Sequence, residues 1–204
     1  WHRLNNPIIK HLPSSSPKSF TLTASPATDL WRPNSASNNF SAPFVYRICS
    51  VENFSRISVT VVPGKEFKSQ WDQGGIAILF PDGDLGGDGK NAKYSWIKTG
   101  LEWENGGLQL STVATYAFSD WSLSPVVPSS KGGGGGVRFL VERNSTELWI
   151  YNILKNHQRY PLREITWAFL ENRGNNNKNN NKKTKKKTKK KNAEIWVGVY
   201  VAKP

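Results

Sequence analysis

The residues best suited to chemistry lie in one alternating segment, Trp96-Ile97-Lys98-Thr99-Gly100-Leu101-Glu102-Trp103. Alternate side chains of an extended strand point to the same face, so Trp96, Lys98, Gly100 and Glu102 share one face. A solvated face seldom needs a Trp and a Gly among its charges, and this Gly leaves space for a ligand or another chain to approach. The segment therefore predicts a polar binding face.

Two flanking segments add polar groups to the same region. Trp71-Asp72-Gln73 precedes a strand, and Ser119-Asp120-Trp121-Ser122 follows the partner strand of the alternating segment. An aromatic plate beside amide, carboxylate and hydroxyl groups suits a sugar ring, because C–H faces stack on the indole and hydroxyls take fixed hydrogen bonds. Arg163 could pair with one of the acids. The predicted ligand-binding residues are Asp72, Gln73, Trp96, Lys98, Glu102, Ser119, Asp120, Trp121 and Arg163.

A structural interpretation of the same residues stays open. Lys98 and Glu102 could form an ion pair on one face of the strand, and Trp121 could close the end of the core. Asp120 could accept backbone N–H bonds in a turn.

Catalysis is not predicted, and glycoside hydrolysis is the enzymatic alternative. It needs two carboxyl groups flanking the scissile bond, and sandwich glycosidases usually carry acids at i, i+2 and i+4 of one strand. Glu102 and Glu104 are followed by Gly106 at the third position, and Lys98 favours an ionised neighbour over a general acid. Neither a Ser/His/Asp or Cys/His site nor a zinc site has suitable ligands. The acidic loop 82–88 lacks the downstream Glu of an EF-hand, so we expect no metal and no cofactor.

The elements that must position these residues are predicted to be β-strands. Trp, Tyr and Phe make up 12% of the 204 residues, and no segment shows sustained helical periodicity. About ten short strands predict an all-β sandwich of two antiparallel sheets. The expected strands are 44–48, 57–62, 75–80, 94–103, 108–118, 137–143, 147–154, 165–170 and 195–201, with turns at 106–107 and 144–145 and the last two strands paired.

The domain is predicted to span residues 20–204, after a disordered polar tail at residues 1–19. Low-complexity inserts at 131–136 and 174–192 fall where hairpin loops are expected. The net charge is +13, but nine lysines lie in the second insert, and the rest of the chain carries only +4. No aromatic residues are interleaved with these lysines, so nucleic acid is expected to bind only non-specifically, and no membrane partner is expected.

The single cysteine, Cys49, allows no internal disulfide and predicts a reducing compartment, the cytoplasm. Three Asn-x-Ser/Thr sequons, at Asn39, Asn53 and Asn144, keep secretion open as the alternative. The sequence begins at Trp1 and not at Met, so the removal of a signal peptide also stays open.

Several ordered motifs resemble a known family. They are Thr28-Asp29-Leu30-Trp31, Ala42-Pro43, Asp72-Gln73-Gly74-Gly75, Trp96-Ile97-Lys98-Thr99-Gly100-Leu101-Glu102, Ser119-Asp120-Trp121-Ser122, Pro161-Leu162-Arg163-Glu164-Ile165-Thr166-Trp167 and Val197-Gly198-Val199-Tyr200. This series resembles the fungal branch of the concanavalin A-like lectin/glucanase domains of unknown function, over about residues 20–204. The resemblance implies a jelly-roll sandwich and no established catalytic mechanism. One yeast member of that family is described as a cytoplasmic regulator of enolase.

Together these observations predict a non-catalytic binding or regulatory module. Its ligand, glycan-like or protein, is expected on the polar face around residues 72–121. The alternatives are a regulator that docks on a metabolic enzyme such as enolase, and a glycoside hydrolase or its accessory domain. Fold alone does not decide among them.

Overall fold

The computed structural model describes residues 1–10, 19–65, 67–81, 94–130, 135–170 and 193–204. These residues form fifteen β-strands and two single-turn 3-10 helices, η1 (Val51–Asn53) and η2 (Pro128–Ser130). In this described part of the chain, no helix has the length and apolar character of a membrane span.

A seven-stranded antiparallel sheet forms the larger layer. Its strands, in spatial order, are β1 (His2–Leu4), β6 (Phe44–Ser50), β15 (Glu194–Ala202), β8 (Gln73–Phe80), β9 (Ser95–Glu104), β10 (Gly107–Thr115) and β11 (Ser119–Pro125). All eight residues of β8 are buried, as the continuous apolar run predicts for a strand covered on both faces.

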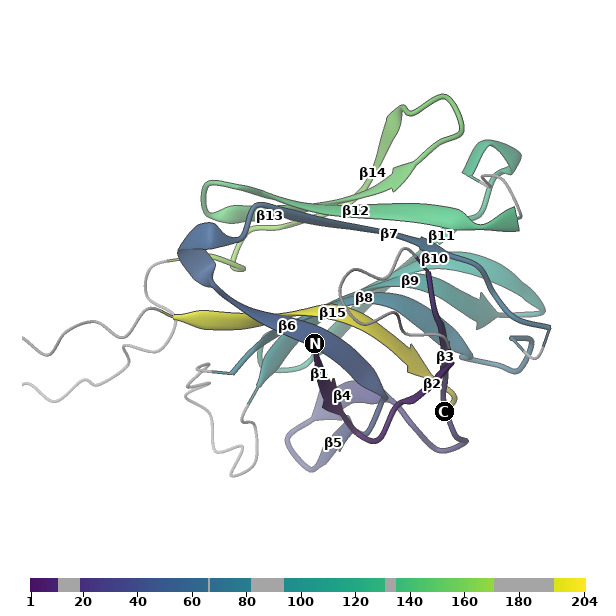
Figure 1. The fold of residues 1–204 in the computed structure, drawn as a ribbon, viewed down its shortest axis with the longest axis horizontal. Coiled ribbons are helices and arrows are strands. Elements are labelled where there is room, and N and C mark those ends of the chain that lie inside the picture. The colour runs from purple at the N-terminus through teal and green to yellow at the C-terminus, as the bar shows by residue number, and fades with distance from the viewer. Residues whose placement is uncertain (11–18, 66, 82–93, 131–134, 171–192) are drawn as a thin grey trace, which may run out of the picture.

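A four-stranded antiparallel sheet packs on one face of the larger sheet, as Figure 1 shows. Its spatial order is β14 (Arg159–Ile165), β13 (Glu147–Ile153), β12 (Val137–Asn144) and β7 (Arg56–Val61). Two small hairpins complete the described elements. They are β2 (Ile8–Lys10) with β3 (Thr21–Thr23), and β4 (Leu30–Asn34) with β5 (Ser37–Phe40). The predicted all-β sandwich of antiparallel sheets is confirmed.

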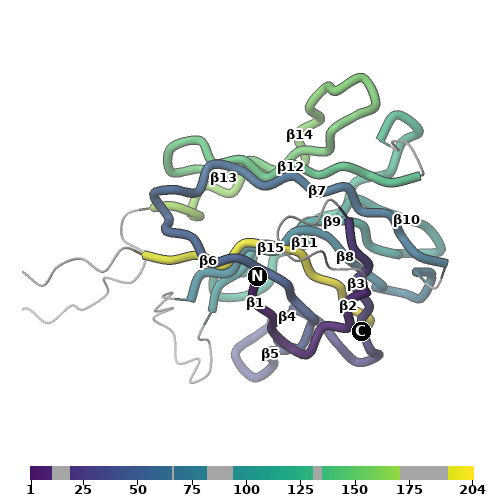
Figure 2. The backbone as a smooth tube through the Cα atoms, in the orientation of Figure 1, coloured from purple at the N-terminus to yellow at the C-terminus, as the bar shows by residue number. Residues whose placement is uncertain are grey.

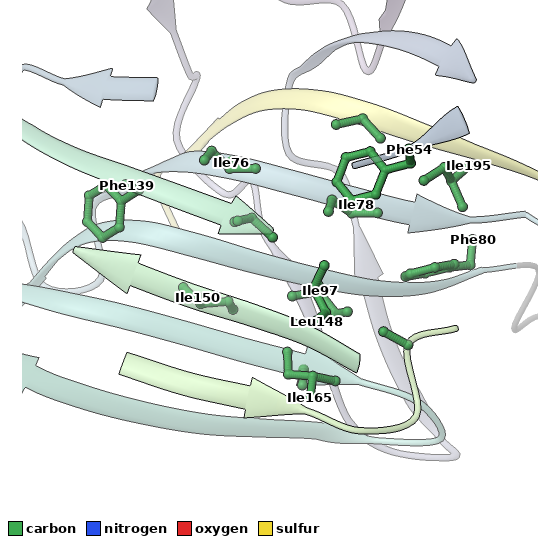
Figure 3. Close-up of a cluster of buried hydrophobic side chains, with 14 of the residues drawn as sticks. Phe54, Ile76, Ile78, Phe80, Ile97, Phe139, Leu148, Ile150, Ile165 and Ile195 are labelled. Carbon is green, nitrogen blue, oxygen red and sulfur yellow. The ribbon is translucent and has the colours of Figure 1, made fainter. Parts of the chain in front are cut away.

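The main core lies between the two sheets. Ile76, Ile78 and Ile97 from the larger sheet meet Phe139 and Ile150 from the smaller one, and all are at most 1% exposed (Figure 3). Each such side chain contributes roughly 1.5–3 kcal/mol through its removal from water. Through Ile97, this core packs against the face of β9 opposite to its polar side chains.

The opposite face of the seven-stranded sheet, here called the outer face, carries a second buried cluster. Phe44, Tyr46, Trp96 and Tyr200 belong to this cluster, and Leu30 of β4 packs on it. The β4–β5 hairpin therefore covers part of the outer face, and it lies on the side away from the four-stranded sheet (Figure 1, Figure 2).

The hairpin that carries the polar face closes at Asn105-Gly106. Both residues have positive φ, at 50° and 80°, the geometry of a two-residue type I′ turn. Glu104 therefore pairs with Gly107, one residue earlier than the predicted turn at 106–107. This register fixes every later pair between β9 and β10, and it sets Ser111 opposite Gly100.

Two sequence-based strand assignments are wrong. Segment 108–118 is not one strand, because β10 ends at Thr115 and the chain turns back, so Ser119 begins β11. Segments 165–170 and 195–201 do not pair. Instead β15 inserts between β6 and β8, and β14 ends at Ile165 after pairing with β13. In this part of the sheet, strands that are distant in the sequence pair with each other, and the two segments that follow one another along the chain do not.

The N-terminal residues also differ from the expected tail. Residues His2–Leu4 form β1 on the edge of the large sheet, and Ile8–Lys10 pair with β3. Leu4 packs on the outer-face cluster, which gives this segment an apolar contact. The remainder of the predicted tail, residues 11–18, lies outside the described residues, as do the acidic loop 82–88 and the insert 174–192. Of the insert 131–136, only Gly135 and Gly136 are described.

Gly100 does not leave space for a ligand. A Cβ at this position would lie 2.1 Å from the carbonyl oxygen of Gly74 and 2.7 Å from the Cα of Gly75. The glycine is needed because β8 and β9 approach each other closely at this pair, which corrects the sequence-based interpretation.

Candidate functional site

The polar residues of β9 lie on the outer face, as the alternation predicts. Sheet register places Gln73 of β8 beside Glu102, and Ser111 of β10 beside Gly100. Lys98 and Glu102 are only 2% and 4% exposed. The predicted polar face exists, but most of it is buried.

Lys98 is the centre of the first group of contacts. Its Nζ donates to Asp29 Oδ1 at 3.1 Å and to Gln73 Oε1 at 2.7 Å. The Tyr200 hydroxyl donates to the same Gln73 oxygen at 3.1 Å. Gln73 Nε2 in turn donates to Asp29 Oδ1 at 3.3 Å and to the Trp71 carbonyl at 3.2 Å. The ion pair of Lys98 is therefore with Asp29 and not with Glu102.

Burial dominates the electrostatics of this group. Desolvation lowers the pKa of Lys98, while Asp29 and then Glu102 act against that shift. Desolvation also raises the pKa of Tyr200 well above its ordinary value. Asp29, Gln73 and Tyr200 surround Lys98 and satisfy one another's hydrogen bonds. Their side chains therefore fill this part of the outer face and leave no room there for a ligand.

Glu102 belongs to a second chain of contacts that reaches the surface. Ser111 Oγ donates to Glu102 Oε2, and Trp121 Nε1 donates to Ser111 Oγ at 3.1 Å. Trp121 is 37% exposed, and the Trp31 ring meets it edge-on with centroids 6.3 Å apart. A buried carboxyl group thus fixes, through one hydroxyl, the orientation of a half-exposed indole.

The pKa of Glu102 shifts in the direction opposite to the sequence-based expectation. Burial raises its pKa, and the Ser111 hydrogen bond and the Lys98 charge, which lower the pKa, do not cancel that effect. We expected Lys98 to hold this carboxyl group ionised. Desolvation outweighs the lysine because Lys98 is hydrogen-bonded to Asp29 and Gln73 instead.

The raised pKa of Glu102 predicts a pH dependence of stability. A carboxyl group whose pKa is higher in the folded than in the unfolded state contributes stability below the unfolded value, 4.5, and loses it as pH rises through the folded pKa. Each tenfold difference in proton affinity corresponds to about 1.4 kcal/mol. Between pH 4 and pH 7, the wild type should therefore lose unfolding free energy relative to Glu102→Gln, as measured by urea denaturation.

Glu52→Gln, at an exposed position in η1, controls for general charge effects. A difference between Glu102→Gln and wild type that is the same at pH 4 and pH 7, or no larger in its change with pH than that of Glu52→Gln, would contradict the assignment.

Trp96 and Ser119 make contacts that hold the β4–β5 hairpin against the larger sheet. Trp96 is fully buried, with the Arg32 guanidinium 4.4 Å from its ring centroid, and its Nε1 has no partner among the described residues. Arg32 donates to the carbonyls of Tyr94 and Ala117, and Ser119 Oγ accepts from the Arg32 backbone N–H at 2.9 Å. These contacts attach β4 to the sheet, where Trp96 is buried and Ser119 is partly exposed.

Asp72 lies apart from the contacts of Lys98 and Glu102. Its Oδ2 accepts the backbone N–H groups of Lys68 and Ser69 at 3.0 and 2.8 Å, and Lys203 Nζ lies 3.2 Å from Oδ1. These contacts stabilise the turn before β8. The carboxylate thus has a structural environment that the sequence interpretation did not anticipate.

Asp120 and Arg163 form the ion pair that the sequence allowed. Arg163 of β14 donates to the Asp120 carboxylate and, at 3.2 Å, to the Asp120 main-chain carbonyl. The Asp120 side chain is 72% exposed, and the pair bridges the edge strands of the two sheets. Of the predicted residues, Trp121 and Asp120 are therefore exposed, and Arg163 and Ser119 are partly exposed.

The sequence interpretation missed Asp29, Ser111 and Tyr200. Asp29 comes from a segment 69 residues before Lys98, and no spacing rule brings the two together. The position of Ser111 could have been predicted from the sequence, because the turn at Asn105-Gly106 determines the pairing register of β9 and β10. Within the ranges that the structure describes, no three His, Cys, Asp or Glu side chains gather in a way that could hold a metal ion.

Comparison with known proteins agrees with the fold and leaves the activity undefined. Residues 4–204 match the family described as "Protein of unknown function (DUF1349)". An uncharacterized protein of Emericella nidulans is 32% identical over 199 residues, which cover 97% of this chain and 84% of the relative. A functionally unknown protein from Saccharomyces cerevisiae has a similar crystal structure, with a TM-score of 0.59 and 19% identity, covering 97% of this chain and 87% of the other. The chain therefore belongs to the DUF1349 family of proteins of unknown function.

Proposed function

We propose that this protein is a non-catalytic binding module whose glycan-like ligand stacks on Trp121. One observation carries the proposal: a half-exposed indole is held by the Ser111 hydroxyl, which is itself bonded to the buried Glu102. A surface ring fixed in this way loses little side-chain entropy when a ligand binds. Trp31 supplies a second aromatic surface beside it.

The remaining predicted residues act indirectly in this proposal. Lys98, Gln73 and Trp96 are buried beneath the surface, and they position β9 and the β4–β5 hairpin. Asp120 adjoins Trp121 in β11, but alternation turns its carboxylate to the opposite face, where it pairs with Arg163 of the four-stranded sheet. The proposed stacking therefore rests on the indole of Trp121 and not on this carboxylate.

The geometry favours binding over cleavage. Glycoside hydrolysis needs two carboxyl groups on either side of a bound sugar. Glu102 is 4% exposed, and the carboxylate of Asp29 is paired with Lys98. Docking on a metabolic enzyme such as enolase, and residence in the cytoplasm, stay predictions of the sequence. Co-purification from cell extract is the measurement for the first.

A glycan array probed with wild type and Trp121→Ala tests the proposal. Wild type should retain at least one glycan, and loss of the stacking surface should weaken that binding roughly tenfold or more. Trp1→Ala is the matched control, because Trp1 is 46% exposed and precedes β1 on the opposite edge of the same sheet. No retained glycan with wild type, or equal losses in both variants, would contradict the proposal.

A further inference from the structure

A second candidate site lies on the four-stranded sheet, on the face turned away from the core. A cleft of about 480 Å³ opens there between β7, β12 and the turn after β13. This volume is within the range of small-molecule sites, roughly 300–1,000 Å³. The cleft is independent of Trp121, which belongs to the other sheet.

Three of the seven described residues that line this cleft have basic side chains. Arg138, Lys155 and His157 all contribute, and none of the described lining residues is acidic. Further along β12, the carboxylate of Glu142 is bound to Arg159 at 2.6 Å. Among the described lining residues, the cleft therefore contains no carboxylate that would neutralise Arg138 and Lys155.

The guanidinium of Arg138 is held in place for an incoming anion. Its Nε donates to Ser58 Oγ at 3.0 Å, and Ser58 Oγ donates to the Phe139 carbonyl at 2.9 Å. The two terminal nitrogens have no partner among the described residues. Because two parallel N–H groups match two oxygens of a phosphate, an oriented guanidinium favours bidentate binding.

Main-chain hydrogen bonds hold the backbone at Lys155 and His157. The Lys155 N–H donates to the Ser129 carbonyl, and the His157 N–H donates to the Leu154 carbonyl, both at 2.9 Å. His157 has a φ of 66°, which places it in the left-handed region of backbone conformation. Ile153 and Leu154 add an apolar surface to the same cleft.

Gly136 allows the side chains of Thr60 and Val62 to lie close to the start of β12. A Cβ there would lie 2.8 Å from Thr60 Cγ2 and 2.9 Å from Val62 Cγ2. The end of β7 can therefore approach the start of β12, with Thr60 on the cleft wall.

From this arrangement we propose that the cleft binds a small organic phosphomonoester. Arg138 takes two phosphate oxygens, Lys155 supplies a point charge, and the His157 ring supplies an N–H donor. The apolar surface of Ile153 and Leu154 contacts the organic part. This assignment does not depend on glycan binding at Trp121.

The test is NMR of the His157 imidazole in the full chain at pH 7, with inorganic phosphate and phenyl phosphate as probes. A local readout is needed because the lysines of the insert 174–192 also attract phosphate. Both probes should move the His157 resonances saturably, while those of His2 in β1 stay in place. Phenyl phosphate should bind several-fold more tightly, because it also contacts the apolar surface.

Two variants separate a built site from general attraction. Arg138→Gln should weaken the binding of phenyl phosphate roughly tenfold, since a charge-assisted pair of hydrogen bonds is lost. Arg56→Gln removes an exposed arginine of β7 outside the cleft and should change nothing. Unsaturable shifts, equal affinity for the two probes, or equal losses in the two variants would overturn the proposal.

Discussion

Asp29→Ala is expected to lower the free energy of unfolding by about 3 kcal/mol, because it leaves the Lys98 ammonium buried without a counter-ion. The Lys98 side chain is 3% exposed and that of Asp29 15%, so water cannot replace the carboxylate easily. The substitution also removes the acceptor of Gln73 Nε2 and of the Leu30 N–H. Urea denaturation of wild type and variant at pH 7 measures the loss.

Asp120→Ala is the matched control for this prediction. It also removes an aspartate from an ion pair, but that side chain is 72% exposed, and exposed pairs contribute at most about 1 kcal/mol. Adding Lys98→Met to Asp29→Ala should recover part of the stability, because the uncompensated charge is then gone. Equal losses for Asp29→Ala and Asp120→Ala would contradict the assigned role of Asp29.

Gly100→Ala is expected to lower the free energy of unfolding by about 3 kcal/mol or more. The added Cβ would lie 2.1 Å from the Gly74 carbonyl oxygen, and the nearby atoms are backbone and not flexible side chains. Relief would require β8 and β9 to separate at the centre of the larger sheet. Circular dichroism followed by urea denaturation measures the effect.

Gly107→Ala serves as the comparison in the same hairpin. A Cβ there meets nothing within 4 Å, and the expected change is within about 0.5 kcal/mol. If Gly100→Ala were equally harmless, the close approach of β8 and β9 would not be a constraint on the fold.

The sequence predicted correctly those parts of the fold that depend on residues close together in the chain. The β9–β10 and β12–β13 hairpins follow from alternating strands and short turns, and the structure confirms both. The placement of β15 between β6 and β8 depends on pairing between distant segments, which local patterns do not encode. Proximity along the chain suggested a hairpin instead, and that prediction was wrong.

The candidate site shows the same division. Alternation along β9 correctly placed Lys98 and Glu102 on one face. It could not show that Asp29 approaches from another element, or that the face is covered, because burial depends on how the β4–β5 hairpin packs. A sequence pattern therefore located the polar face but did not establish how much of it a ligand can reach.

The contact between Arg163 and β11 has a consequence for the behaviour of this protein at high concentration. β11 is an edge strand, and the exposed backbone groups of such strands can template the addition of another chain. Arg163 donates a hydrogen bond to the Asp120 carbonyl and places a charged, bulky side chain at that edge. At this point of the edge, the contact therefore disfavours the addition of another strand, whether or not a ligand is bound.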